Sequence, residues 1–254
     1  MQSEFLFWSA ALFSAIFVGL GKGGLPVVAS LAVPSLSLVM SPIAAAGLLL
    51  PVYVVSDIFA LFAYRRDYEP QVLKIGLIGM TVGVLIGWAT AHLVIEWVVT
   101  ILIGFMGAIF SVHQILKKLY QTEQNKLISH KKGYFWSTVA GFTSFISHNG
   151  GPPWQIFVLP IGLSKSVFVG TSVIAFSYVN AIKLIPYYFL GQMSLGNLKI
   201  ALYLMVPASI AVYVGFRLVK LIPEQVFFKI VISALFLISF KLIWDGFKSS
   251  GLFI

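Results

Sequence analysis

The stretch LFWSAALFSAIFVGLGKGGLPVVASLAVPSLSLV, residues 6–39, decides the fold of this chain. An apolar run is interrupted at Gly21-Lys22-Gly23-Gly24-Leu25-Pro26, and a second apolar run follows the interruption. The pattern recurs at residues 134–163, where His148-Asn149-Gly150-Gly151-Pro152-Pro153 separates YFWSTVAGFTSFIS from WQIFVLPIGL. Each run has about 10 to 16 residues, which is short for a membrane-spanning helix and typical of a re-entrant or discontinuous one. We therefore expect two helical hairpins that enter the bilayer.

The composition places the whole chain in a membrane. Of its 254 residues, 59% are hydrophobic and only 10% are charged, whereas about a quarter of a soluble domain is charged. The net charge of +9 would suggest a nucleic-acid partner in a soluble protein. Here the basic residues lie between apolar runs, so they are better explained as signals of membrane topology. We expect the lipid bilayer as a partner and no nucleic acid.

The sequence offers little for catalysis or metal binding. It has no cysteine, and its four histidines show no metal-ligand spacing with carboxylates, so we expect no cofactor and no metal. It contains neither paired carboxylates nor a Ser-His-Asp set, which argues against an enzyme. A G-x-x-x-x-G-K-[ST] phosphate-binding loop is also missing, which argues against an ATP-driven pump.

Six apolar segments are long enough to cross a bilayer. A helix rises about 1.5 Å per residue and the hydrocarbon core is about 30 Å thick, so a span needs about 20 residues. The predicted spans are 43–64, 75–95, 97–116, 166–189, 200–216 and 226–244.

The chain contains an internal repeat. Gly23-Gly24-Leu25-Pro26 corresponds to Gly150-Gly151-Pro152-Pro153, and Leu73-Lys74-Ile75 corresponds to Leu198-Lys199-Ile200, each about half a chain length later. We therefore predict an all-α polytopic membrane protein of two inverted-topology repeats, each a broken or re-entrant helical hairpin plus three transmembrane helices. The first half is 1–116 and the second is 134–254.

The segment between the halves, 117–133, predicts the orientation of the chain. It carries five lysines and a single acidic residue, Glu123. Because basic loops stay on the cytoplasmic side, we expect this linker to be cytoplasmic and both termini to lie outside. The protein would be a multi-pass protein of the plasma membrane.

The two breaks are candidate anion sites. Unpaired backbone amides are costly in lipid, so a break survives where it lines a cavity or is buried in protein. A helix that starts after such a break presents free amides and the positive end of its dipole, which favour an anion, and proline suits its first turn because no N–H is needed there. Lys22, His148 and Asn149 add side-chain donors. The predicted substrate-binding residues are Lys22, Gly23, Gly24, Pro26, His148, Asn149, Gly150, Gly151, Pro153 and Trp154.

Each of these residues also has a structural interpretation. The glycines would serve close helix packing, Lys22 would reach the membrane surface, and His148 would end a helix. Trp154 would anchor at the headgroup level. A second glycine set, at 76, 79, 83 and 87, has the spacing of a helix-packing face, within the protomer or across a homodimer, and has no predicted chemistry.

Asp57 and Lys183 lie inside predicted spans, where an unpaired charge costs about 2.5 to 3.5 kcal/mol or more. They should therefore face the protein interior. Asp57 corresponds to Asn180 in the repeat, and Asn180 shares a helix face with Lys183. One interpretation is an Asp57–Lys183 ion pair that joins the halves. The other is a coupling or gating group of Asp57, Asn180 and Lys183, in which Lys183 attracts the anion and Asp57 carries a proton.

These motifs resemble those of the sulfite exporter TauE/SafE family of membrane permeases. The Gly-Gly-x-Pro break, its His-Asn-Gly-Gly-Pro-Pro counterpart and the repeat carry the resemblance, which covers about residues 5–245. It implies secondary transport, with export as the expected direction, of a small sulfur-containing anion such as sulfite or an organosulfonate. A proton or cation gradient would drive it, and access to the midplane breaks would alternate between the two sides. The alternative is an anion channel, or a permease for another small oxyanion or carboxylate.

Overall fold

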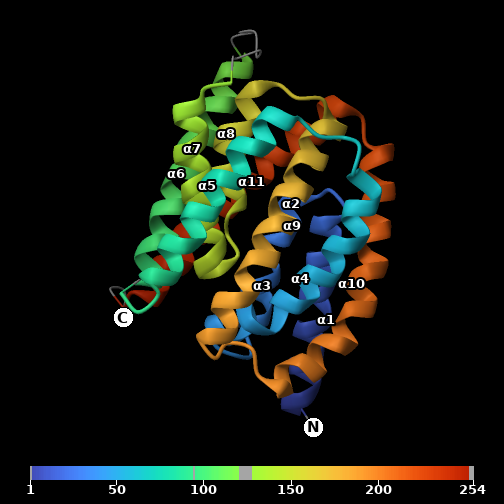
Figure 1. Ribbon diagram of the computed structural model, residues 1–254, viewed down its shortest axis with the longest axis vertical. Helices are drawn as coiled ribbons and strands as arrows, with labels where there is room; N and C mark the ends of the chain where they lie inside the picture. The colour runs from blue at the N-terminus through green and yellow to red at the C-terminus, as the bar shows by residue number, and fades with distance from the viewer. Residues whose placement is uncertain (1, 94, 120–127, 252–254) are drawn as a thin grey trace. The chain divides into compact units, whose positions relative to one another are not determined.

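The computed structural model describes residues 2–93, 95–119 and 128–251, which contain helices and no strand (Figure 1). The predicted all-α class is confirmed. In chain order the elements are α1 (Gln2–Lys22), α2 (Pro26–Ala29), α3 (Ala32–Leu36), α4 (Pro42–Tyr64), α5 (Pro70–Ala89), α6 (Glu96–Leu119), α7 (His130–Ser147), α8 (Gly151–Val158), the 3-10 helix η1 (Leu159–Ile161), α9 (Lys165–Phe189), α10 (Leu195–Leu221) and α11 (Glu224–Ser249).

Seven of the described helices are long and apolar enough to cross a membrane. Six of them correspond to the six predicted spans, with ends that differ by several residues. The protein is therefore a multi-pass membrane protein. The candidate spans are Glu4–Lys22, Ile43–Tyr64, Pro70–Ala89, Trp97–Leu116, Lys165–Phe189, Leu195–Leu221 and Glu224–Ser249.

The seventh candidate span, α1, corrects the expectation of a short first arm. The helix has 21 residues and continues through Gly19 and Gly21 to Lys22. Glycine lowers helix propensity by about 1 kcal/mol relative to alanine, but tertiary packing outweighs this cost. A Cβ atom at Gly19 would lie 2.6 Å from the Cβ of Ala211 on α10, so the neighbouring helix approaches the glycine backbone closely.

The second broken region also differs in length from the prediction. Its first arm, α7, has 18 residues, and its second arm consists of the eight-residue α8 followed by η1. Because α6 ends at Leu119 and α7 begins at His130, helices extend into both ends of the basic segment 117–133. Residues 120–127 of that segment, which include Glu123 and Lys126, lie outside the described residues.

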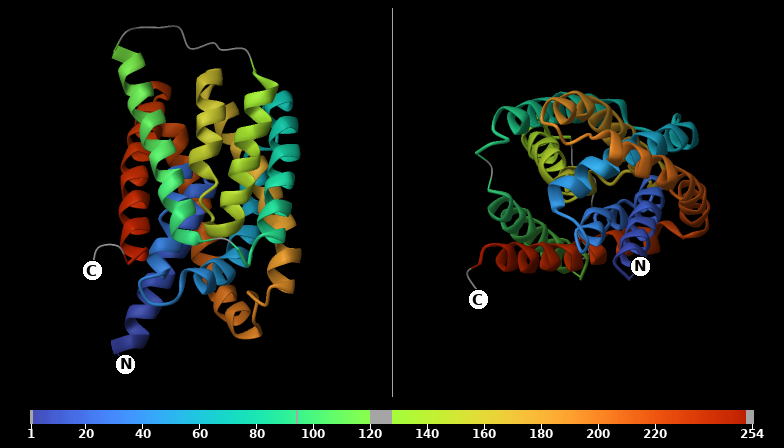
Figure 2. Two further views of the ribbon diagram at one scale, coloured as in Figure 1. Left: turned by 90° about the vertical axis from the view of Figure 1, so that its left-hand side faces the viewer. Right: turned by 90° about the horizontal axis from the view of Figure 1, so that it is seen from below.

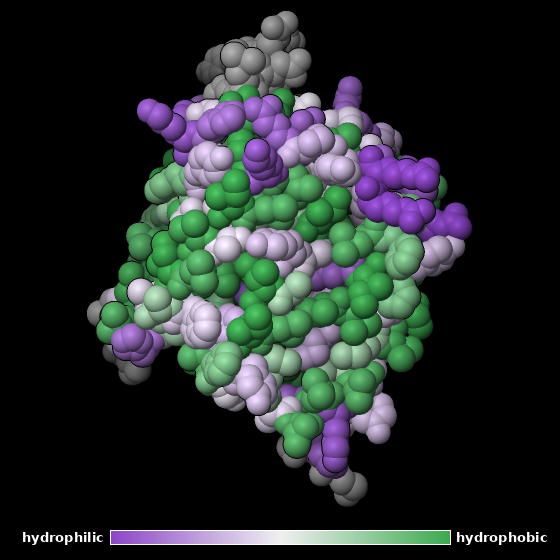
Figure 3. Space-filling view, in the orientation of Figure 1, coloured by the Kyte–Doolittle hydropathy of each residue, from purple (hydrophilic) through white to green (hydrophobic). Residues whose placement is uncertain are grey.

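The surface carries many exposed large apolar side chains. Phe62, Tyr188 and Leu202 are each more than half exposed, as is Trp244. Green, apolar side chains cover most of the face in Figure 3. A soluble monomer rarely exposes apolar area on this scale, whereas a bilayer solvates it.

The described chain divides into two compact units, each made of two segments. The first comprises Met1–Glu69 and Val169–Pro223, and the second comprises Pro70–Phe168 and Glu224–Ile254. Each unit therefore contains helices from both predicted halves of the sequence.

In the first unit, α1 packs closely against α10. A Cβ atom at Gly23 would lie 2.8 Å from the Cα of Gly215, which is closer than real Cβ contacts come. The core of this unit is formed by apolar side chains of α1, α3, α4 and α10, among them Leu36, Leu48 and Leu204. This packing fixes the end of α1, where Lys22 lies.

In the second unit, the glycine face of α5 packs against α7. A Cβ atom at Gly79 would lie 2.6 Å from the Cβ of Ser137, and one at Gly83 would lie 2.6 Å from the backbone nitrogen of Phe142. The predicted packing face is therefore confirmed, and it acts within the chain. Figure 2 shows α6 (green) and α11 (red) side by side in the same unit.

Two of the close helix pairings are related by the predicted repeat. In that repeat α1 corresponds to α7, and α10 corresponds to α5. The packing of α1 on α10 and of α7 on α5 is therefore what an exchange of helices between equivalent halves produces. The inverted topology itself stays a prediction.

Candidate functional site

The first break is a tight turn whose amides are already used. After α1 ends at Lys22, the N–H groups of Gly23, Gly24 and Leu25 donate to carbonyl oxygens of the last turn of α1, over 2.8, 3.2 and 3.1 Å. These amides satisfy the C-terminal carbonyls of α1, which would otherwise lack partners. The expectation that they are free to bind an anion is therefore wrong for this break.

Gly24 is the residue that makes the turn possible. Its φ angle is 115°, a conformation that residues with a Cβ atom rarely adopt. A Cβ atom there would also lie 2.6 Å from the hydroxyl oxygen of Tyr64. That hydroxyl donates a 2.7 Å hydrogen bond to the carbonyl oxygen of Gly23, which ties the turn to the end of α4. Helix α2, which starts at Pro26, is only four residues long.

Next to this turn, Lys22 forms a buried ion pair with Asp57. The Lys22 Nζ lies 2.5 Å from the Asp57 Oδ1, and the two side chains are only 7% and 5% exposed. The Lys22 Nζ also lies 5.4 Å from the centroid of the Tyr53 ring, within the range of a cation–π contact. Lys22 is therefore held inside the first unit, which contradicts its interpretation as a surface-reaching lysine.

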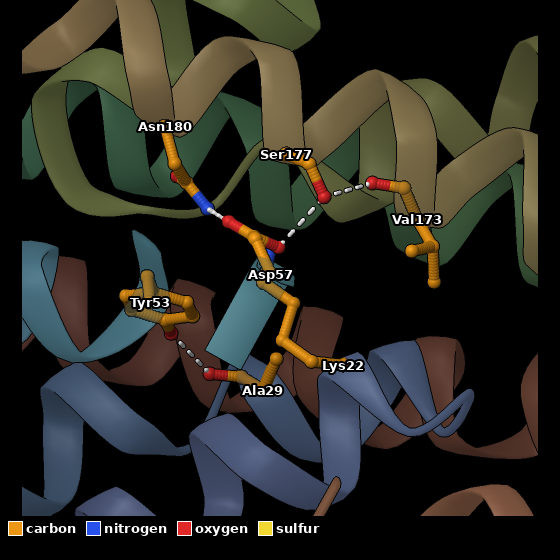
Figure 4. A network of polar contacts seen from close by, with 7 residues as sticks. All are labelled: Lys22, Ala29, Tyr53, Asp57, Val173, Ser177 and Asn180. Carbon is orange, nitrogen blue, oxygen red and sulfur yellow. Dashed lines mark hydrogen bonds and ion pairs between the residues drawn. The ribbon is translucent and has the colours of Figure 1, made fainter. Parts of the chain in front are cut away.

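Helix α9 provides further contacts for the Asp57 carboxylate (Figure 4). The Asn180 Nδ2 donates to Oδ2 over 2.8 Å, and the Ser177 Oγ lies 2.9 Å from Oδ1. The same Ser177 Oγ lies 2.7 Å from the carbonyl oxygen of Val173. Since a hydroxyl has one proton, these two acceptors compete for it. Asp57 thus links the two halves of the sequence, but the ion pair that the structure gives it is with Lys22, where Lys183 was expected.

Lys183 lies in the same unit and is completely buried. Its Nζ is 6.0 Å from the centroid of the Tyr187 ring, one turn further along α9. Its charge interacts with those of Lys22 and Asp57. The first unit therefore buries two lysine side chains and one aspartate side chain in one cluster, which we call the Lys–Asp–Lys cluster: Lys22, Asp57 and Lys183.

The second break, in the second unit, has a different geometry. Helix α7 ends at Ser147 and is capped by His148, whose φ angle of 56° is left-handed. The His148 N–H donates to the Ser144 carbonyl and the Asn149 N–H to the Thr143 carbonyl, over 3.1 and 3.3 Å, which is the usual way of closing a helix C-terminus. The Asn149 side-chain amide donates to the Ser147 Oγ over 3.2 Å.

Helix α8 then begins with unused donors. Pro152 and Pro153 have no N–H group, and the N–H groups of Gly150 and Gly151 donate to none of the described residues. These two amides lie at the positive end of the α8 dipole. The second break therefore retains the free amides that the first break lacks.

Two neighbouring side chains of α8 are buried. Trp154 is 1% exposed, and a Cβ atom at Gly76 would lie 2.8 Å from its ring, so it packs in the interior of the second unit. This position contradicts its interpretation as a headgroup anchor. Gln155 is 3% exposed, and its Oε1 has no hydrogen-bond partner among the described residues. Sequence reasoning missed Gln155, although a lone amide in an apolar run signals a special environment.

The structure thus brings the predicted residues together in two groups. Lys22, Gly23 and Gly24 lie in the first unit with the predicted coupling residues 57, 180 and 183. Residues 148–154 lie in the second unit. Tyr53 and Tyr64, which the sequence did not single out, contact the first group.

Comparison with curated proteins and comparison with solved structures both find no match. A protein-family model does match, and it covers nearly the whole chain, from residue 6 to residue 242. The described helices, the interrupted regions and the match agree, and the chain belongs to the sulfite exporter TauE/SafE family of membrane transporters.

Proposed function

We propose that this protein is a secondary transporter of a small sulfur-containing anion, sulfite or an organosulfonate, and that it acts as an exporter by alternating access. The family description supports the substrate class. The protein would use ion gradients, because the sequence contains no phosphate-binding loop of the G-x-x-x-x-G-K-[ST] type. It would need no cofactor and would catalyse no covalent step.

The observation that carries this proposal is the Lys–Asp–Lys cluster. Burying an ion without a partner costs several kcal/mol, so buried charges in membrane proteins pair with each other or mark an ion pathway. When all three groups are ionised, the cluster holds one positive charge in excess. A monovalent anion such as bisulfite or a sulfonate balances that charge.

The cluster also suggests how the anion is held. Because the amides of the first break bond to α1, the donors that the first unit offers are its lysine side chains. Lys183 provides the attraction, and Lys22 is the second donor once it leaves Asp57. The second unit offers a set of donors of its own, which are the amides of Gly150 and Gly151 and the His148 ring.

The contact between Lys22 and Asp57 provides a coupling step. When Lys22 turns to an anion, Asp57 loses its ion pair and keeps its contacts with Ser177 and Asn180. The carboxylate freed in this way is the group that we propose to take up the proton. Anion binding and proton uptake are thereby linked through one side chain.

We further propose that the protein lies in the plasma membrane, with the basic segment 117–133 in the cytoplasm and both termini outside. The excess of lysine in that segment supports this orientation. The chain has no native cysteine, so single cysteines introduced at Ser3, Gln124 and Ser250 give an unambiguous test. A membrane-impermeant thiol reagent applied to intact cells should label positions 3 and 250 and leave position 124 unlabelled.

The transport proposal is tested with the purified full-length protein in proteoliposomes. Uptake of sulfite, thiosulfate, sulfate and methanesulfonate is measured with and without an imposed pH gradient. We expect saturable flux of sulfite or the sulfonate that responds to the gradient. If the flux does not saturate with anion concentration and single-channel conductance is seen, the protein is a channel instead. Sulfate or a carboxylate as the preferred anion would overturn the substrate assignment.

A further inference from the structure

The second unit contains a pocket that the transport proposal does not use. It lies between the C-terminal part of α6, the first turns of α7 and the end of α8 with η1, and its volume is about 290 Å³. Its polar wall consists of His113 and Gln114 from α6 with Ser129 and Lys132 from the start of α7. None of the residues of the second break lines it.

The polar wall has the donors that an anionic headgroup requires. Lys132 provides an ammonium group, Ser129 a hydroxyl and His113 a ring N–H. Gln114 is only 7% exposed and lines the pocket, so its side-chain amide adds an N–H donor for an anionic group. Among the described residues, no acidic one lines this pocket.

The rest of the pocket lining is apolar and aromatic. Phe110, Trp136 and Phe157 line it together with Pro160 and Ile161. Pockets that combine an apolar wall with a few converging polar groups are the usual sites for organic ligands. An inorganic oxyanion would use the donors and leave this wall without contacts, whereas an uncharged apolar molecule would make no use of Lys132 and Gln114.

We propose that this pocket binds an anion that carries an apolar group, with its headgroup on Lys132, Ser129 and Gln114 and its apolar part on Trp136 and Phe157. A membrane lipid with an anionic headgroup and a free alkyl sulfonate share this chemistry. The pocket lies at the ends of α6 and α7 that lead into the basic segment 117–133, where Lys131 and Lys132 stand side by side. Such a position suits a ligand that arrives along the membrane surface.

Binding is measured with full-length protein in nanodiscs of phosphatidylcholine, titrated with 1-hexanesulfonate, sulfate or 1-hexanol by isothermal calorimetry, with empty nanodiscs as the blank. Hexanesulfonate should bind saturably, and sulfate and hexanol at least about tenfold more weakly, because a hydrogen bond to a charged group and the apolar contact each contribute about a factor of ten. Lys132→Gln and Gln114→Leu should each weaken hexanesulfonate binding by about tenfold.

Lys131→Gln is the matched control, because Lys131 is the adjacent exposed lysine and does not line the pocket. It should change the affinity less than twofold. Equal effects of the two lysine substitutions, or hexanol binding as tightly as hexanesulfonate, would overturn the proposal.

A second experiment, with a lipid as the probe, identifies the source of the ligand. Native mass spectrometry of protein from nanodiscs that also contain phosphatidylglycerol counts retained lipid. If Lys132→Gln abolishes the retention of phosphatidylglycerol and Lys131→Gln preserves it, the proposal is supported and the ligand is a lipid headgroup. Saturable hexanesulfonate binding without lipid retention supports a free organic anion. If neither probe depends on Lys132, the pocket has no anion site, and the transport proposal is unaffected because no flux enters this test.

Discussion

Replacing Asp57 by asparagine should destabilise the protein far more than replacing Lys22 by methionine. Both substitutions preserve the approximate shape of the side chain and break the same 2.5 Å ion pair. They differ in what they leave behind. Asp57→Asn leaves the buried Lys22 without its carboxylate partner, whereas Lys22→Met leaves Asp57 with Lys183 in the same cluster and with its contacts to Ser177 and Asn180.

The size of the difference follows from the burial of the three groups. Lys22 and Asp57 have side-chain exposures of 7% and 5%, and Lys183 is completely buried. Removing one partner of a buried pair costs about 3 to 5 kcal/mol because the other charge is left without compensation. We expect this full cost for Asp57→Asn. For Lys22→Met we expect about 1.5 to 3 kcal/mol, the cost of losing a hydrogen bond to a charged group, because the net charge of the cluster falls to zero.

The free energy of unfolding is measured in mixed micelles by titration with dodecyl sulfate, with tryptophan fluorescence as the signal. The chain contains a matched control in α11, where Lys241 and Asp245 form an exposed ion pair with side-chain exposures of 41% and 37%. Asp245→Asn should cost less than about 1 kcal/mol. If Asp57→Asn costs no more than the control, or Lys22→Met costs as much as Asp57→Asn, the reasoning about the Lys–Asp–Lys cluster is wrong.

Three further substitutions test the breaks and the packing. Gly24→Val should abolish transport and lower the yield of folded protein, because φ is 115° and the new Cβ atom would meet the Tyr64 hydroxyl at 2.6 Å; normal flux would show that the turn tolerates a side chain. Gly83→Val should separate α5 from α7 and reduce the folded fraction seen by size-exclusion chromatography, while Gly196→Ala, whose Cβ atom would meet its nearest neighbour only at 3.8 Å, should have no effect. His148→Gly should raise the free energy of unfolding by about 1 kcal/mol, because a left-handed residue with a Cβ atom is strained. The same substitution should weaken anion binding. If the variant binds the anion as tightly as the original protein, His148 serves only to end helix α7.

The repeat equivalence of residues 57 and 180 has a direct structural counterpart. Asp57 and Asn180 occupy matching places in the two halves of the sequence, and their side chains form a hydrogen bond. The sequence alone predicted that these polar groups face the interior, because lipid excludes them. It did not predict that Lys22, thirty-five residues before Asp57, would be the ion-pair partner. That choice depends on the packing of α1 against α10, which leaves no local pattern, and on the geometry of the turn at Gly24, of which the sequence shows only the position.

The sequence by itself determined the membrane class, six of the seven candidate spans, the two interruptions and the glycine face of α5. Each of these follows from local composition or spacing, since a bilayer demands long apolar helices and a close approach demands small residues. Only the tertiary structure decided that α1 runs on to Lys22, that the amides of Gly23–Leu25 are already bonded while those of Gly150 and Gly151 are not, and that Trp154 is buried. These features depend on which backbone and side-chain atoms lie within hydrogen-bond distance, and that depends on contacts between helices that are far apart in the chain.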